Sequence, residues 1–302
     1  MNFSEYTLVS FGDSFTFGQD IVPHYVNQDW GTLELQEKYK KTCNGNSYTQ
    51  VIADSFGFKD SLNFGVLAGS NERSLTLLEP FLRSNPTLKI FVLFNFTSSS
   101  RFLQFLKIDG KREYDEMNIH TTAIESNLNL REGIYTGISK RSLNNQYTYW
   151  RNSIQDMYNH IKDRRMLYYM LYRYNVPHAT FDIMNDTDYR MLRNNPINYI
   201  HRNDGYGIEF LYNDDERYVF KERDFLKSYH QELVDKSPLL THIGMDYLSG
   251  QRNFISYINN MARNKHNDDN YYLGEDNGHW NSEGHREVAK LIEKFINEKY
   301  DN

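Results

Sequence analysis

The sequence predicts an α/β fold in which a parallel sheet is covered by helices on both faces. Three observations lead to this prediction. Short apolar segments alternate with stretches of helical periodicity along much of the 302-residue chain. Polar loops follow three of the apolar segments, and the last periodic stretch, 285–300, is amphipathic. Strands that alternate with helices in this way form βαβ units, which build parallel sheets.

Four segments are predicted to be short buried strands. Each is rich in β-branched or aromatic side chains and is bounded by Gly, Asn or Pro. They are TLVSF (7–11), SLNF (61–64), KIFVLF (89–94) and HATFDI (178–183). In parallel sheets, functional residues gather at the carboxyl ends of the strands, so we expect the loops after the first three strands to meet at one rim.

Four further stretches place apolar residues at helical spacing. In the last of them, Val288, Ile292 and Phe295 share one stripe, and charged residues occupy the remaining surface. The four stretches are 46–58, 70–84, 164–175 and 285–300.

We expect one domain spanning 1–302, with long insertions at about 19–45, 105–150 and 185–235. These ranges are polar, and the last two are rich in Asn, Tyr, Asp and Arg with weak periodicity. No Pro- or Gly-rich linker, internal repeat or low-complexity run divides the sequence.

The composition indicates a soluble protein of the cytoplasm. The formal net charge of -6 gives no general attraction to nucleic acid. The single cysteine, Cys43, excludes an intramolecular disulfide framework and a multi-cysteine zinc site. The first residues lack the pattern of a secretory signal, and the longest strongly apolar run is IFVLF at 90–94. Because that run is far too short to span a bilayer, we expect no membrane partner.

The first predicted strand runs into a turn, GDS at 12–14, and a second glycine follows at Gly18. Turns and helix N-caps prefer Asp and Ser, so the turn can be purely structural. Alternatively, it presents the Ser14 hydroxyl for chemistry. A serine hydroxyl is a poor nucleophile until a base removes its proton, so this second interpretation requires a histidine elsewhere in the chain.

A suitable histidine lies before the last helix, in EDNGHWNSEGH at 275–285. Asp276 and His279 are three residues apart, so on a tight turn the carboxylate can accept the Nδ1–H of the imidazole. That hydrogen bond would fix the tautomer and leave Nε2 free to act as a base. In the structural alternative, Asp276 and Asn281 cap backbone N–H groups where the helix begins.

A Ser–His–Asp set also needs donors for the oxyanion that develops on the attacked carbonyl. Gly69, in the GVLAGSN loop after the second strand, offers a backbone N–H that no side chain obstructs. Asn95 or Thr97, in FNFTSSS after the third strand, offers a side-chain donor. A turn glycine and hydrogen bonding at a strand end are the structural alternatives.

In chain order, these segments resemble the sequence blocks of the SGNH (GDSL-type) hydrolases. GDSFTFG and DNGHWNSEGHREVA are close to the family pattern, and NFGVLAGSNERS is similar to variants in tailed-phage members. The third block departs from the pattern, because FNFTSS stands in place of the usual GxND. The third oxyanion donor is therefore open between Asn95 and Thr97. The resemblance runs from residue 7 to about 295, without the long insertions.

The resemblance implies a flavodoxin-like three-layer α/β/α sandwich that hydrolyses or transfers acyl esters without a metal or an organic cofactor. Ser14 would be the nucleophile, His279 the general base and Asp276 the orienting carboxylate. The backbone N–H groups of Ser14 and Gly69 would form the oxyanion hole, completed by the side-chain donor of the third block. The aromatic, Asn- and Lys-rich composition resembles phage-encoded members, which implies the host cytoplasm or a virion.

We expect a serine esterase that removes an acetyl or other short acyl group from a small-molecule or carbohydrate ester. The carbohydrate part follows the habits of the family and the Tyr- and Asn-rich insertions, which can stack on sugars or form a core of their own. The alternatives are an O-acyltransferase with the same triad, and a non-catalytic carbohydrate-binding or virion structural protein on the same fold.

Other classes of site are disfavoured by missing motifs. The sequence contains no GxSxG elbow, no GxxxxGK[ST] or GxGxxG loop and no HExxH. A metal site formed by Asp276, His279 and His285 is not expected, because His285 begins a helix beside Gly284 and is predicted to point elsewhere.

Overall fold

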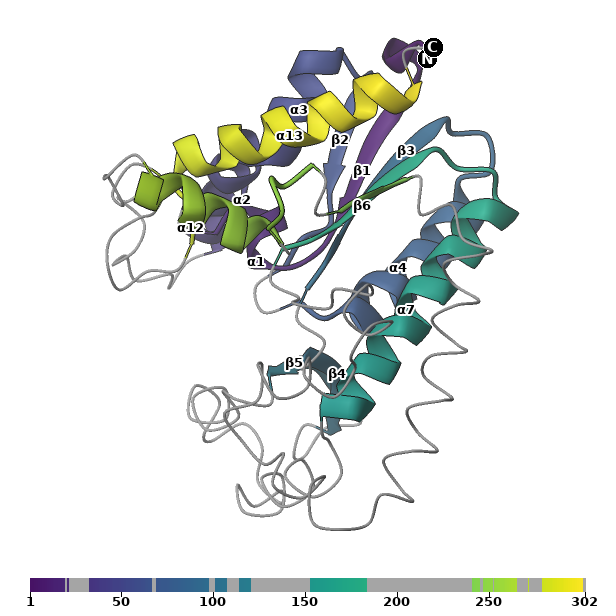
Figure 1. The fold of residues 1–302 in the computed structure, drawn as a ribbon. Helices are drawn as coiled ribbons and strands as arrows, with labels where there is room; N and C mark the ends of the chain where they lie inside the picture. The colour runs from purple at the N-terminus through teal and green to yellow at the C-terminus, as the bar shows by residue number, and fades with distance from the viewer. Residues whose placement is uncertain are drawn as a thin grey trace, which may run out of the picture. The chain divides into compact units, whose positions relative to one another are not determined.

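The computed structural model divides into two compact units (Figure 1). Unit 1 contains Met1–Ser98, Met170–Asn185 and Thr241–Asn302, and unit 2 contains Ser99–Tyr169 and Asp186–Leu240. The structure describes residues 1–19, 21, 33–66, 69–97, 101–107, 114–120, 153–183, 241–244, 247–251, 253–264, 271 and 279–300. Parts or all of the ranges 19–45, 105–150 and 185–235 lie outside these residues, so the domain with three insertions stays a prediction.

Unit 1 contains a five-stranded sheet in which every strand pairing is parallel. Its strands are β1 (Thr7–Phe11), β2 (Asp60–Asn63), β3 (Ile90–Phe96), β6 (His178–Asp182) and β7 (His242–Ile243). Their order, β2-β1-β3-β6-β7, is that of a flavodoxin-like, doubly wound sheet. In the register of the sheet, Thr7 lies beside both Asp60 and Ile90. The four predicted strands are confirmed, with small shifts at their ends.

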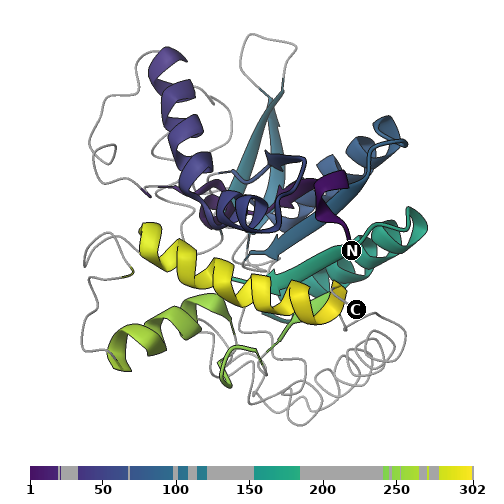
Figure 2. The same cartoon turned by 90° about the horizontal axis from the view of Figure 1, so that it is seen from above.

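Helices lie on both faces of this sheet (Figures 1 and 2). The helices of unit 1 are α1 (Ser14–Phe17), α2 (Leu33–Asn46), α3 (Tyr48–Phe56), α4 (Asn71–Ser84), α12 (Phe254–Asn264) and α13 (Ser282–Tyr300). Helix α7 (Ser153–Arg173) runs from unit 2 into unit 1. None of the helices within the described ranges is long and apolar enough to cross a membrane.

The side chains of the strands alternate between two covered faces. Leu8 and Phe91 belong to one buried cluster with side chains of α3, α12 and α13. On the opposite face, Phe11 stacks on Phe64 at 5.2 Å between ring centroids, and Phe64 meets Phe81 of α4 at 5.4 Å. Because apolar side chains project from both faces of the sheet, helices must cover both faces. The predicted three-layer α/β/α fold is therefore confirmed.

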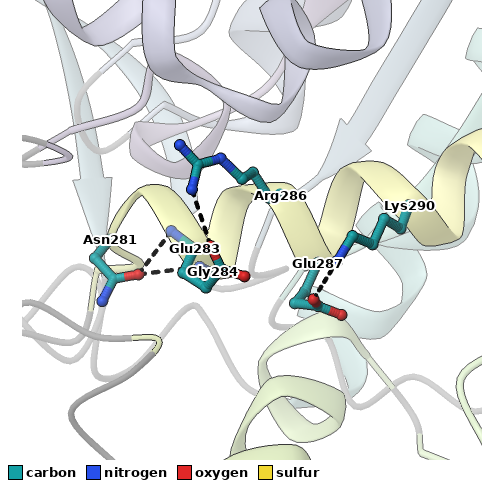
Figure 3. A network of polar contacts seen from close by, with 6 residues as sticks. All are labelled: Asn281, Glu283, Gly284, Arg286, Glu287 and Lys290. Carbon is teal, nitrogen blue, oxygen red and sulfur yellow. Dashed lines mark hydrogen bonds and ion pairs between the residues drawn. The ribbon is translucent and has the colours of Figure 1, made fainter. Parts of the chain in front are cut away.

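Asn281 caps the first turn of α13. Its Oδ1 accepts the backbone N–H groups of Glu283 at 2.9 Å and Gly284 at 3.0 Å (Figure 3). These N–H groups have no acceptor within the helix, so the cap satisfies two donors that would otherwise lack a partner. Figure 3 also shows exposed ion pairs along the helix, such as Arg286 with Glu283. Ion pairs of this kind contribute little to stability.

Several elements were not predicted from the sequence. Helix α2 lies in the range that was expected to be a polar insertion, and it buries Tyr39 and Cys43 in a small cluster with Ile21. Helix α12 and the two-residue strand β7 were also missed. Unit 2 contains an antiparallel pair of strands, β4 (Arg101–Lys107) and β5 (Tyr114–His120).

Side chains reinforce the short pairing between β6 and β7. His242 lies with Nε2 3.3 Å from Asp182 Oδ2 and with Nδ1 2.9 Å from Thr180 Oγ1. One residue earlier, Thr241 Oγ1 lies 2.8 Å from His178 Nε2. These polar contacts join residues 241 and 242, at the start of β7, to strand β6.

Candidate active site

Three loops meet at the carboxyl edge of the sheet, as the sequence predicts. Ser14 follows β1, Gly69 follows β2 and Thr97 follows β3. The first two loops are in direct backbone contact, since Val66 N–H donates to the carbonyl of Gly12 at 3.3 Å. The third joins them through Thr97, whose hydroxyl bonds Asp13.

Ser14 and His279 lie within hydrogen-bond distance of each other. His279 Nε2 is 3.0 Å from Ser14 Oγ, although 265 positions separate the two residues in the chain. Ser14 is buried, and His279 is half-buried. The distance lies within the range for a hydroxyl that transfers its proton to an imidazole base. The structure thus brings together the two residues on which the sequence interpretation depends.

Local structure explains how Ser14 is presented. β1 is buried along its whole length and ends at Phe11, and Ser14 is the first residue of the short helix α1. Asp13 caps this helix, since its Oδ1 accepts Phe15 N–H at 3.1 Å. The helix stops after four residues at Gly18, whose φ of 79° is in the left-handed region that glycine adopts without strain.

His279 is held by the start of α13. The helix begins three residues later, and the backbone N–H of its cap, Asn281, donates to the carbonyl of Tyr271 at 2.9 Å. The imidazole also packs against Phe15, with 5.1 Å between ring centroids. His279 is therefore positioned both by the start of its own helix and by Phe15, the residue after Ser14.

Asp276, the predicted orienting carboxylate, lies outside the residues that the structure describes. Its role in a Ser–His–Asp triad stays a prediction.

The two predicted backbone donors differ in their surroundings. Ser14 N–H is at the first position of α1, where a helix supplies no acceptor, and it has no partner among the described residues. Gly69 N–H donates to the carbonyl of Val66 at 3.1 Å. A Cβ at Gly69 would lie 2.8 Å from the carbonyl oxygen of Gly12, so only glycine allows this close approach.

The side-chain donors of Asn95 and Thr97 both bond Asp13. Asn95 Nδ2 lies 3.1 Å from Asp13 Oδ1 and 3.0 Å from Thr16 Oγ1. Thr97 Oγ1 donates to Asp13 Oδ2 at 2.7 Å. Their common orientation agrees with the expectation that the two residues share a face of the strand. The partner they share, however, is the carboxylate of Asp13, the residue before Ser14.

Asn71 is a further buried residue that sequence reasoning missed. Its Oδ1 accepts Thr97 N–H at 2.9 Å, and its Nδ2 donates to the Thr97 carbonyl at 3.4 Å. This reciprocal pair ties the start of α4 to the end of β3. The GSN sequence of the second loop was the available signal, because an asparagine at a helix start beside a strand end can bond exposed backbone groups.

His285 points away from Ser14, as predicted. Its Nδ1 accepts the backbone N–H of Tyr48 at 3.2 Å, and its ring stacks on Tyr48 and meets Trp280 edge to face. Burial, together with a smaller contribution from the charge of His279, lowers the pKa of His285 to about 3. His285 is thus neutral at physiological pH and serves as a cap for α3. Within the described ranges, no group of three or more His, Cys, Asp and Glu could hold a metal ion.

No family model matches the sequence, and no curated protein matches it. Solved structures with a similar course of the chain include a member of the lipolytic protein G-D-S-L family from Veillonella parvula DSM 2008. The two sequences are 12% identical, the TM-score is 0.35, and the match covers 98% of this chain and 99% of the Veillonella chain. The lipase/acylhydrolase from Enterococcus faecalis is 12% identical with a TM-score of 0.36, covering 96% and 95%.

A carbohydrate esterase is 12% identical with a TM-score of 0.40, and the match covers 98% of this chain and 69% of that one. The assignment of a three-layer α/β/α fold therefore rests on the strand order and register of the sheet in this chain, and not on these similarities.

Proposed function

We propose that the chain is a serine hydrolase of carboxylic esters, with Ser14 as the nucleophile and His279 as the general base. The observation that carries the proposal is the 3.0 Å between His279 Nε2 and Ser14 Oγ. A hydroxyl bonded to an imidazole is the arrangement that activates a serine. Both groups lie at the carboxyl edge of a parallel sheet, where such folds place their chemistry.

In the proposed reaction, Ser14 Oγ attacks the ester carbonyl carbon as its proton passes to His279 Nε2. The tetrahedral intermediate collapses when the C–O bond to the alcohol breaks and His279 returns the proton to the leaving oxygen. Water then attacks the acyl-enzyme with His279 again as base, which releases the acid and restores the serine. Asp276 is proposed to accept Nδ1–H and stabilise the imidazolium.

The oxyanion is proposed to bind the backbone N–H groups of Ser14 and Gly69. Ser14 N–H has no acceptor among the described residues, whereas Gly69 N–H must transfer from the Val66 carbonyl to the substrate. Loss of one oxyanion donor typically costs about 3–4 kcal/mol of transition-state stabilisation. If Gly69 N–H leaves the Val66 carbonyl only when the oxyanion forms, its new hydrogen bond stabilises the transition state more than the bound ester.

The substrate is proposed to be an ester of a short acyl group, such as acetyl, on a carbohydrate. The carbohydrate part rests on the sequence resemblance and on the Tyr- and Asn-rich insertions, and the likeness to phage-encoded proteins rests on the sequence and its composition. A non-catalytic binding protein is the second candidate, and one specific observation favours it. The donors of Asn95, Thr97 and Gly69 all have acceptors within the protein, which leaves a resting site with few open donors.

Reaction with a fluorophosphonate probe and with p-nitrophenyl acetate tests the proposal. Wild type should be labelled and should turn over the ester, and Ser14→Ala should do neither while keeping its melting temperature. A folded wild type that resists the probe would favour the binding protein. Acceptor-dependent product in excess of hydrolysis would instead indicate an acyltransferase.

A further inference from the structure

We infer that Asp13 is a positioning residue for Ser14, and that Asn95 and Thr97 act through its carboxylate and not on the substrate oxyanion. The inference rests on the proposed esterase function, because it assigns roles around the same nucleophile. It also resolves the choice between Asn95 and Thr97 that the sequence leaves open.

The carboxylate of Asp13 is fully buried and receives donors from two elements. Phe15 N–H of α1 and Asn95 Nδ2 of β3 both lie 3.1 Å from Oδ1. The Thr97 hydroxyl, just beyond β3, donates to Oδ2 at 2.7 Å. Burial of a carboxylate is costly unless such donors compensate it. The donors therefore fix the carboxylate at this place.

These bonds fasten the backbone on both sides of the nucleophile. Asp13 precedes Ser14, and Phe15, whose N–H it accepts, follows Ser14. The segment that carries Ser14 Oγ and Ser14 N–H is thus attached to the end of β3 through the Asp13 side chain, in addition to the bond from Asn95 to Thr16. A small rotation of this segment would move Oγ off its 3.0 Å contact with His279 Nε2.

The donor capacity of both third-block residues is used in this arrangement. An amide nitrogen has two hydrogens, and those of Asn95 reach Asp13 Oδ1 at 3.1 Å and Thr16 Oγ1 at 3.0 Å. A hydroxyl has one hydrogen, and that of Thr97 reaches Asp13 Oδ2. To serve an oxyanion, Thr97 would have to take its hydrogen from the buried carboxylate, and Asn95 would have to take one from Asp13 or from Thr16. The geometry therefore favours positioning over direct stabilisation.

The structure also supplies a matched control. Thr49, on α3, is buried, and its hydroxyl has no hydrogen-bond partner among the residues that the structure describes. Thr49→Val and Thr97→Val make the same chemical change at buried sites, but only the second removes a bond to Asp13.

The test is a double-mutant cycle between Asp13→Ala and Thr97→Val, run after wild type and Ser14→Ala have established labelling at Ser14. Each single change should lower kcat on the order of tenfold, with little change in KM, because a misplaced reactive group slows the chemical step. The double variant should be no slower than Asp13→Ala alone, since Thr97 acts only through that carboxylate. Thr49→Val should leave kcat unchanged.

Two results would overturn the inference. Losses that multiply in the double variant would mean that Thr97 contributes independently, as an oxyanion donor does. A Thr97→Val protein with a lower melting temperature but a wild-type kcat would mean a merely structural role. If Asp13→Ala fails to fold, Asp13→Asn replaces it in the cycle. Its Oδ1 still accepts Phe15 N–H and Asn95, so it should fold and retain part of the rate. A wild type without labelling would count against the esterase itself, before any Asp13 variant is compared.

Discussion

Phe15 and Trp280 pack ring against ring, with 4.6 Å between their centroids and 57° between their planes. Each directly follows one member of the Ser14–His279 pair, and both are buried. Aromatic contacts of this geometry add to the stability that burial provides. The pair therefore joins two distant parts of the chain next to the atoms whose separation matters for the proposed reaction.

Removing the Phe15 ring should damage both stability and reactivity. Phe15→Ala should cost about 3–5 kcal/mol of unfolding free energy, as usual for a buried phenylalanine. It should also slow fluorophosphonate labelling, because the His279 ring loses a neighbour at 5.1 Å. Phe3→Ala is the control, since Phe3 is equally buried, at 5% exposed, among other aromatic rings. It should lose similar stability in urea unfolding but label at the wild-type rate per folded molecule. Equal labelling by both variants would contradict this role for Phe15.

Acid should destabilise the protein through His285. Its pKa is about 3 in the folded protein, against an ordinary value of 6.5, because burial disfavours the charged ring. Above pH 6.5 the ring is neutral in both states, and between pH 6.5 and 3 only the unfolded chain takes up the proton. Stability from this group is thus lost as the pH falls through that window, by about 1.4 kcal/mol per pH unit.

Urea unfolding of wild type and His285→Gln at pH 7, 6, 5 and 4 measures this effect. The difference in unfolding free energy between the two proteins should shrink as the pH falls, because the variant lacks the titrating ring. A difference that stays constant with pH would show that His285 is not the group responsible.

The close approach of the first two loops should make Gly69 intolerant of substitution. A Cβ there would lie 2.8 Å from the Gly12 carbonyl oxygen and 2.9 Å from Val66 Cγ2. Gly69→Ala should therefore lower the melting temperature and the labelling rate together. Gly45→Ala should be neutral or stabilising by roughly 0.5–1 kcal/mol, because it lies in α2 with open space around it. Calorimetry with labelling of both variants distinguishes crowding at the site from a general intolerance of alanine.

Loss of the Asn281 cap of α13 should lower the reaction rate through His279, although the cap contributes only modestly to the free energy of unfolding. Asn281→Ala removes an acceptor for two N–H groups and should cost about 1 kcal/mol. Because His279 lies just before this turn, kcat for p-nitrophenyl acetate should fall while KM stays near wild type. Asn281→Asp keeps the acceptor and should restore both stability and kcat. A full loss of rate in Asn281→Asp would contradict a capping role.

The central sheet could be predicted from the sequence because local patterns mark its strands, whereas the proximity of Ser14 to His279 was expected from the family resemblance of the ordered sequence blocks. Buried runs such as 89–94 mark strands, and the polar residues after them mark the rim. Helix α2 was not predicted because, among its residues 37–46, only Tyr39 and Cys43 are buried, and they lie within a polar stretch. Strand β7 is too short to carry a pattern of its own.

The destinations of individual hydrogen bonds could not be predicted. Asn95 and Thr97 were correctly placed at a strand end beside the nucleophile loop, but the acceptor of their bonds depends on the position of Asp13 in three dimensions. A turn aspartate gives no sign in the sequence that it will be buried with neighbours on β3. Residue type, spacing and the resemblance therefore indicated the candidate site, and tertiary contacts were needed to propose different roles for its residues.

The parallel pairing of β6 with β7 sets a lower limit on how far residues 184–240 can be trimmed. Parallel neighbours cannot be joined by a tight hairpin, because the connection must run from the carboxyl end of one strand to the amino end of the next, which takes about a dozen residues or more. Above that limit, the entropy of closing the connection changes slowly with its length. The polar contacts of His242 and Thr241 should then keep the edge strand in register with any replacement of sufficient reach.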